Sequence, residues 1–165
     1  MKPIAGRVGQ ILITCLSIAV MASTAGQVAA QEIVTRTKQG SFDDVRFDLG
    51  NAIISTGVSV QSEGNIAAML GRTAADLGAT ETVYSRAEFV AFCSAKFSRA
   101  MMEADPAYIA FCPFVVFVYE AKAKPGEIVV GYRRPILPPS ASDAGRKAAT
   151  DADALMAKIV ADAVK

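Results

Sequence analysis

The chain contains no histidine and no tryptophan among its 165 residues. The lack of histidine excludes Ser-His-Asp and Cys-His catalysis, His-ligated haem and zinc sites with a histidine ligand, because each needs an imidazole. The chain also lacks a charge imbalance, with 17 basic and 16 acidic residues, and it has no block of basic residues. This balance argues against nucleic acid and against an anionic membrane surface as partners.

The first thirty residues have the three-part layout of a secretory signal peptide. Lys2 and Arg7 precede an apolar run over residues 11–22, and Val28 and Ala30 are small enough for signal peptidase. The run is about a dozen residues long, whereas a helix that spans a bilayer needs roughly 20. We therefore expect cleavage near Ala30 and a periplasmic protein that has no membrane contact after cleavage.

The basic start of the signal is short and has no Arg-Arg pair, which indicates export of an unfolded chain rather than of a folded protein with its cofactor in place. We accordingly expect no bound organic cofactor. Cys15 lies inside the apolar run and follows Thr14, so lipid attachment is not expected. Removal of the signal leaves 135 residues with 15 basic and 16 acidic side chains, which is enough for one domain with a single core.

The mature chain begins with a strand-like and then a helix-like segment. Residues 33–37 alternate with a period of two, which predicts a strand. Ser41 has capping-box spacing to the acidic residue three positions on, and apolar residues then recur at helical spacing. We predict a helix over residues 41–56, closed by Gly57, and a short second strand over residues 58–63.

A second, weaker helical stripe follows over residues 65–78. Gly71 interrupts it and Gly78 ends it. Met69 lies in the apolar stripe, and we interpret it as core filling rather than as a metal ligand.

The segment that follows admits two interpretations. One is a single long helix that begins near Ser85; the other is a strand over residues 88–93 followed by a shorter helix over residues 95–104. Periodicity does not decide between them. Both end the helix near Asp105, because Pro106 disfavours helical geometry in the residue before it.

The residue pattern in the remainder of the chain predicts a hairpin and a C-terminal helix. Residues 114–121 are almost wholly apolar, as expected of a central strand buried on both faces, and a Pro-Gly turn leads into a return strand that ends at 133. We divide the chain into a signal peptide over 1–30, one α/β domain over 31–136, and a Pro/Ser linker with an amphipathic helix over 137–165. The apolar stripe of that helix needs a partner, either the domain's own sheet or a second subunit.

The run FCSAKFSRAMMEADPAYIAFCPFVVFVYE, with GEIVVGY after it, resembles the bacterial family named domain of unknown function 302. In the family pattern a strand ends in Cys-Asn-Pro, a helix closes with an acidic residue and proline, and Leu-Pro-Cys opens an apolar strand that ends in Tyr-Glu. The matching positions here are Cys93, Asp105-Pro106, Pro113 and Tyr119-Glu120. The resemblance covers roughly residues 33–134.

The resemblance implies a strand over residues 87–93 and an α+β fold. We expect a two-layer α/β sandwich, in which a small mixed or antiparallel sheet carries helices on one face, together with the C-terminal helix. It also implies a possible homodimer. The family has no established activity, so the resemblance implies a fold and not a function.

This chain departs from the family pattern in two places. Ser94-Ala95 replaces Asn-Pro, and the second cysteine lies two positions earlier, at Cys112. A two-residue shift along an extended segment keeps a side chain on the same face, so Cys93 and Cys112 can still meet.

Cys93 and Cys112 have three interpretations. Two cysteines in an exported protein are the usual setting for a disulfide, and closing a loop of about 20 residues would contribute on the order of 3 kcal/mol. Alternatively, Cys93 precedes a helix whose dipole favours a thiolate, which would suit redox, sulfur-carrier or soft-metal chemistry. The third interpretation is two buried free cysteines.

No pair of carboxylates has a spacing that demands acid–base chemistry. We therefore predict an exported, non-catalytic domain that binds a small ligand or a periplasmic protein, as a homodimer, with a thiol-based redox, sulfur-carrier or soft-metal protein as the alternative. The candidate pocket near the cysteines consists of Ser94, Asp105, Tyr108, Pro113 and Tyr119.

Overall fold

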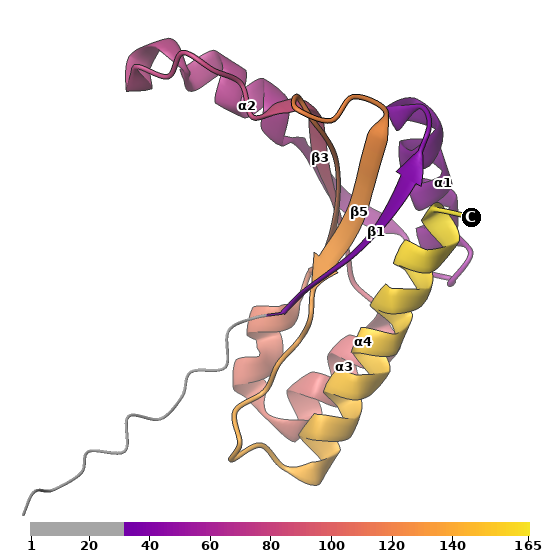
Figure 1. The fold of residues 1–165 in the computed structure, drawn as a ribbon. Helices are drawn as coiled ribbons and strands as arrows, with labels where there is room; N and C mark the ends of the chain where they lie inside the picture. The colour runs from indigo at the N-terminus through magenta and orange to yellow at the C-terminus, as the bar shows by residue number, and fades with distance from the viewer. Residues whose placement is uncertain (1–31) are drawn as a thin grey trace, which may run out of the picture.

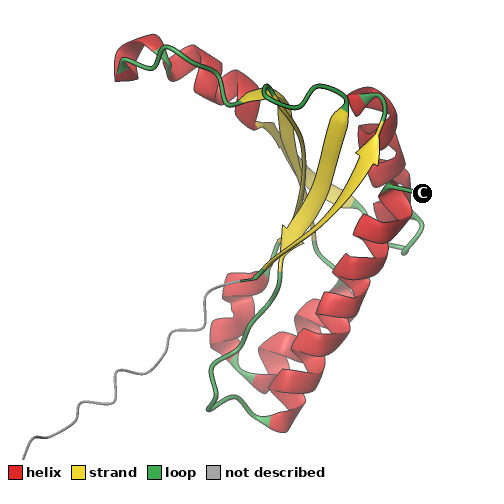
Figure 2. Ribbon diagram, viewed as in Figure 1, coloured by secondary structure: helices red, strands yellow, loops and turns green. Residues whose placement is uncertain are grey.

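A computed structural model describes residues 32–165, so the predicted signal peptide lies outside the described residues. The described chain forms a five-stranded sheet in the order β1-β5-β4-β3-β2, and every neighbouring pair of strands is antiparallel (Figure 2). The strands are β1 (Ile33–Gln39), β2 (Val60–Asn65), β3 (Tyr84–Phe92), β4 (Phe114–Ala121) and β5 (Glu127–Arg133).

Helices cover one face of this sheet (Figure 1). The α-helices are α1 (Phe42–Ile54), α2 (Ile66–Thr73), α3 (Ala95–Ala104) and α4 (Asp143–Ala163), with two 3-10 helices, η1 (Ala75–Leu77) and η2 (Pro106–Phe111). The long helix α4 packs against α1 at one end and α3 at the other. The predicted α+β sandwich with helices on one face and a C-terminal helix is confirmed.

The core lies between the sheet and the α1–α4 layer. Alternate side chains of the central strands point toward the helices, as the period of two in a strand requires. The fully buried members come from β3, β4 and β5 and from α1, α3 and α4; the largest are Tyr132, Phe92, Leu49, Ile53, Met101, Ile128, Met156 and Ile159. The apolar stripe of α4 is therefore covered by the sheet and helices of its own domain.

The predicted first helix forms close to its expected bounds. The Ser41 hydroxyl accepts a hydrogen bond from the Asp44 backbone N–H at 3.4 Å, which satisfies one of the orphan donors at the start of α1. Gly57 follows the helix with a φ of 79°, a left-handed conformation that glycine adopts without a steric cost.

The ambiguous segment before Pro106 is a strand followed by a short helix. β3 pairs with β2 on one side and with β4 on the other, and its Val90 and Phe92 side chains are fully buried in the core. The interpretation as one long helix from Ser85 is wrong, because strand pairing on both sides and burial in the sheet decide the structure of a segment whose periodicity allows either form.

The segment 66–83, which contains α2 and η1, projects from the sheet and is called the arm below (Figure 1). None of its helical residues is buried: Met69 is 39% exposed and Leu77 is 78% exposed. The interpretation of Met69 as core filling is wrong, since α2 packs chiefly along β3 and its residues stay outside the buried core.

Within the described part of the chain, no helix is both long enough and apolar enough to cross a membrane.

Candidate functional site

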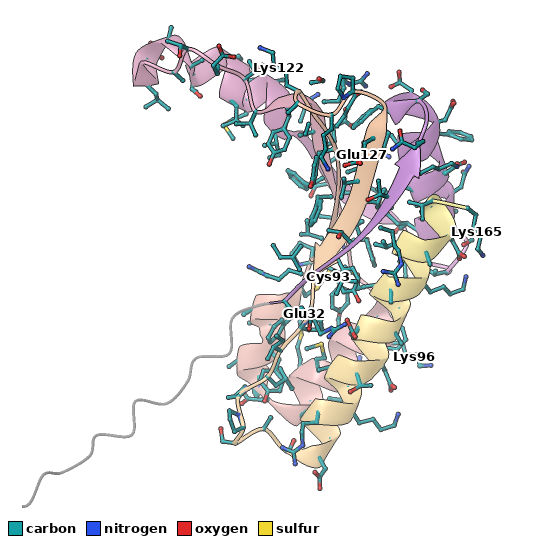
Figure 3. All side chains as sticks on the ribbon, in the orientation of Figure 1. Glu32, Cys93, Lys96, Lys122, Glu127 and Lys165 are labelled. Atoms are coloured by element: carbon teal, nitrogen blue, oxygen red, sulfur yellow. A yellow bond between two sulfur atoms is a disulfide. The ribbon has the colours of Figure 1, made fainter. Side chains whose placement is uncertain are left out.

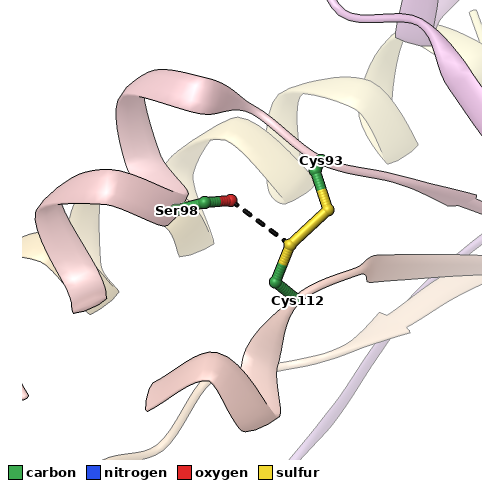
Figure 4. The surroundings of a disulfide bond; sticks show 3 residues. All are labelled: Cys93, Ser98 and Cys112. Carbon is green, nitrogen blue, oxygen red and sulfur yellow. Dashed lines mark hydrogen bonds between the residues drawn. A yellow bond between two sulfur atoms is a disulfide. The ribbon is translucent and has the colours of Figure 1, made fainter. Parts of the chain in front are cut away.

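Cys93 and Cys112 form a disulfide (Figure 4). Cys93 directly follows β3, and Cys112 lies two residues before β4. Because Phe92 pairs with Phe114 across these strands, the two cysteines reach the same end of the sheet, with their Cα atoms 6.2 Å apart. This separation lies in the usual range for a disulfide. The interpretation as two free cysteines is wrong.

The surroundings of the disulfide are polar on one side. The Ser98 hydroxyl, on the second turn of α3, lies 3.5 Å from Cys112 Sγ (Figure 4). Ser94 occupies the N-cap position of α3, but its side chain makes no capping hydrogen bond; its carbonyl oxygen accepts from the Ser98 N–H at 2.8 Å. The Cys112–Pro113 peptide bond is cis.

The other predicted pocket residues have separate local contacts. Ser94 and Tyr108 are buried, and Tyr108 packs edge-on against Phe111 with ring centres 6.0 Å apart. The Asp105 carboxylate accepts from the Ala107 N–H at 2.8 Å and thereby caps η2. Tyr119 points to the face of the sheet that the helices leave open.

That open face consists of the strand side chains directed away from α1 and α4. It carries Val115, which is 41% exposed, and half-buried aromatic rings on β3 and β4. Tyr84 and Tyr119 have ring centres 5.3 Å apart, and Phe117 stacks on Tyr119 at 6.0 Å. The expectation that β4 is buried on both faces is wrong, because no helix of the described chain covers this side (Figure 2).

Two strand glycines accommodate these rings. A Cβ at Gly64 would lie 2.1 Å from Phe89 Cε1, and a Cβ at Gly131 would lie 2.6 Å from Phe117 Cζ. The two phenylalanine rings therefore lie flat over the backbone of the neighbouring strand. Glycine inside a strand is a signal for such close approach, and it could have indicated this surface from the sequence.

Two adjoining hollows lie between the arm and β3. The larger, of about 490 Å³, is polar in part and is lined by Asn65, Ala67, Ala68, Thr82, Tyr84, Ser85, Arg86 and Lys122. The smaller, of about 150 Å³, is mainly apolar; its lining includes Leu70, Ala74, Leu77, Val83 and Tyr84. Lys122 lies where the arm meets the sheet (Figure 3). Sequence reasoning missed both hollows, because they depend on the projection of the arm.

Two cations border the larger hollow. Arg86 Nη2 lies 2.8 Å from Asp43 Oδ1, and this hydrogen bond raises the pKa of Arg86. Lys122 Nζ lies 3.2 Å from Glu81 Oε2. Exposed ion pairs of this kind are worth little in water, so either cation can exchange its carboxylate partner for another anion.

A buried tyrosine joins the sheet to α4. Tyr132 Oη donates to Asp153 Oδ1 at 2.6 Å, and Arg134 Nε donates to the same oxygen at 3.2 Å. Burial raises the pKa of Tyr132, and the hydrogen bond to Asp153 adds to this effect. The contact is an internal one and stabilises the packing of α4. Among the described residues, no group of histidine, cysteine, aspartate and glutamate side chains is arranged to hold a metal ion.

The fold and the disulfide together define a small two-layer α+β domain. A family model described as "Domain of unknown function DUF302" matches residues 33–163. The chain therefore belongs to the DUF302 family, and the match extends through α4.

The fold is also known from a solved structure. The crystal structure of an uncharacterized conserved DUF302 protein from Bacillus stearothermophilus superposes with a TM-score of 0.66 and 14% sequence identity. The alignment covers 81% of this chain and 98% of that chain. At this identity the likeness shows the fold alone. No curated protein matches the chain.

Proposed function

We propose that this protein is an exported, non-catalytic domain that binds a small amphipathic anion in the hollows beside the arm. The observation that carries the proposal is the contact between an apolar hollow and one bordered by cations. The two share Ala67, Thr82 and Tyr84 in their linings, so a single molecule can occupy both.

The lining residues define the class of ligand. Leu70, Leu77 and Val83 offer apolar surface for a short hydrocarbon or ring, and most small-molecule sites combine such surface with a few polar groups. Arg86 and Lys122 offer charged donors for a carboxylate. A carboxylic acid with an apolar body matches both parts.

The disulfide supports the export part of the proposal. Disulfides persist in oxidising compartments such as the periplasm and are rare in the cytosol. In this role Cys93 and Cys112 stabilise the β3–β4 end of the sheet and take no part in ligand binding.

The test is a titration of the exported protein with octanoate, followed by ¹H–¹⁵N NMR. We expect shift changes confined to residues 65–86 and to Lys122, and an approximately 10-fold weaker Kd for Lys122→Glu, because a charged hydrogen bond is replaced by repulsion. The matched control is Lys147→Glu, since Lys147 is also an exposed lysine paired with one carboxylate. Absence of shifts up to about 10 mM octanoate, where even a millimolar Kd would saturate, would overturn the proposal.

A thiol-based function is the second candidate. The observation that favours it is the Ser98 hydroxyl 3.5 Å from Cys112 Sγ, because a donor at this position stabilises a thiolate after reduction. Cys93 also precedes the N-terminus of α3, where the helix dipole favours an anionic sulfur.

Equilibration with dithiothreitol or glutathione buffers distinguishes the two candidates. A structural disulfide has a reduction potential below about −300 mV, whereas catalytic pairs lie near −270 to −120 mV. A potential in the catalytic range that becomes more negative in Ser98→Ala would support the thiol function. A potential below about −300 mV would exclude it.

A further inference from the structure

We propose that β1 binds an extended acidic segment of another protein, which adds to the sheet as a further strand. β1 lies at one edge of the sheet, whereas β2 and the arm lie at the opposite edge (Figure 1). The proposal therefore goes beyond the octanoate-binding function and uses none of the residues that line its hollows.

The hydrogen bonds between β1 and β5 leave alternate backbone groups of β1 directed away from the sheet. The Arg134 N–H donates to the Glu32 carbonyl at 2.9 Å, and the Gly40 N–H donates to the Gly126 carbonyl at 3.0 Å. Hydrogen-bonded positions recur at every second residue of an antiparallel pair, so the even-numbered residues of β1 bond to β5. The N–H and C=O groups of the odd-numbered residues point to the outer edge; these residues are exposed, and they are Ile33, Thr35, Thr37 and Gln39.

The outer edge of β1 lacks the protection that the other edge strand has. β2 contains a register shift between Val60 and Ser62, and it runs directly into α2. Bulges and covering segments are devices by which native sheets block further pairing at an edge. β1 is regular over its seven residues and contains neither a bulge nor a proline. Such an edge can accept an extended peptide by β-strand addition.

Arg36 already places a hydrogen-bond donor at this edge. Its guanidinium Nη1 donates to the Thr35 carbonyl at 3.1 Å, which is one of the outward acceptors, so it takes the place of an N–H from a neighbouring strand. Within residues 32–165, Arg36 forms no ion pair. An N–H of the added strand replaces the guanidinium at Thr35 and releases it to bind a carboxylate of that strand.

The charges beside the edge define the added strand as acidic. Val34 packs against the core, and the period of two places Arg36 and Lys38 on the same side of the sheet. On an added antiparallel strand, the residues opposite these two cations occupy the closer, non-hydrogen-bonded pairs, where opposite charges stabilise the pairing and like charges weaken it. Lys38 also contacts Asp48 at 3.3 Å, so Arg36 is the main determinant.

This chain does not supply an acidic strand from its own N-terminal segment or from a second β1. Residues 1–31 contain no aspartate or glutamate. Full antiparallel pairing of β1 with β1 of a second copy would place Arg36 directly opposite Arg36, because Arg36 is the central residue of the strand, and these like charges would repel. The occupant is therefore a segment of a different protein.

An NMR titration of the exported protein with acetyl-Thr-Val-Glu-Val-Glu-Val-Thr-amide tests the proposal. Both glutamates lie on one side of this peptide when it is extended, and its valines lie on the other. We expect saturable ¹H–¹⁵N shift changes centred on the odd-numbered residues of β1, with a Kd below about 1 mM. A peptide with lysine in place of glutamate, and a peptide N-methylated at its valines, should each bind at least about 10-fold more weakly, because the first reverses the charge and the second removes the backbone donors.

Two substitutions test the same contact from the protein side. Arg36→Glu should weaken binding of the glutamate peptide by at least about 10-fold and favour the lysine peptide instead. Thr37→Pro removes an outward N–H without removing a bond to β5, so we expect it to stay folded by circular dichroism and to lose binding. The matched control is Arg99→Glu, since Arg99 is an exposed arginine on α3 paired with one carboxylate, and it should leave the Kd unchanged.

Three results would overturn the proposal. The first is the absence of shift changes on β1 at about 5 mM glutamate peptide, where a millimolar Kd would be largely saturated; shift changes confined to the arm count as this result. The second is equal binding of the lysine or the N-methylated peptide. The third is a Kd that neither Arg36→Glu nor Thr37→Pro changes. None of these results bears on octanoate binding, which is measured separately.

Discussion

Loss of the Cys93–Cys112 disulfide should cost a predictable amount of stability. The two residues are separated by 19 positions, and cross-linking a loop of this length removes conformational entropy from the unfolded chain worth about 3 kcal/mol at 25 °C. Both cysteines are only partly buried, so the packing lost on truncation is small. We therefore expect the double variant Cys93→Ala/Cys112→Ala to fold, with its free energy of unfolding reduced by about 3 kcal/mol.

The assay is urea unfolding followed by circular dichroism at one fixed protein concentration, because oligomerisation would also change the apparent stability. With a denaturant dependence of about 2 kcal/mol per molar urea, the midpoint should fall by about 1.5 M. Reduction of the wild type should give the same midpoint as the double variant.

Ser98→Ala is the control for this prediction. It removes the hydroxyl that contacts Cys112 Sγ and leaves the loop closed, so we expect a change of no more than about 1 kcal/mol. A loss below about 1 kcal/mol in the double variant would refute the reasoning, since it would mean that the loop ends are already held together in the unfolded chain.

Three further substitutions test the packing of the sheet and the helix of the arm. Tyr132→Phe removes the hydrogen bond to Asp153 at 2.6 Å, and we expect urea unfolding to show a loss of about 1–2 kcal/mol. Burial raises the pKa of Tyr132 in the folded state, so deprotonation favours unfolding. The free energy of unfolding of the wild type should therefore fall as the pH rises above about 10. An equal loss between pH 9 and 11 in Tyr132→Phe would contradict this assignment. Gly131→Ala would place a Cβ 2.6 Å from Phe117 Cζ, and we expect a loss of about 1–3 kcal/mol in the same assay. Gly71→Ala, in α2 with no atom within 4 Å of the new Cβ, should instead raise stability by about 0.5–1 kcal/mol, and a loss at Gly71 would show that the arm does not stay helical.

Much of the local structure could be predicted from the sequence. The Ser41 cap, the end of the helix before Pro106 and the Pro-Gly turn after β4 all depend on side chains and backbone geometry within a few residues of one another. Such interactions depend only on the spacing of residues along the chain, so α1, the end of α3 and the β4–β5 hairpin formed where the pattern indicated.

The cysteine pair could be predicted only in part. Composition identified the two cysteines, and the resemblance to the family placed each beside a strand. Their bond depends on the register in which Phe92 faces Phe114, and a sequence pattern does not define the pairing of two strands. The choice between the disulfide and free thiols therefore came from the fold.

Outside residues 85–104, the sequence by itself determined which segments are strands and helices, which stripes are apolar, and which kinds of chemistry are excluded by the lack of histidine. Only the tertiary structure decided what covers each stripe. The stripe of α4 packs against its own domain, whereas the similar stripe around Met69 and the outer side of β4 lie open. The physical reason is that periodicity describes the direction of a side chain relative to its own backbone, and burial depends on which distant segment arrives on that side.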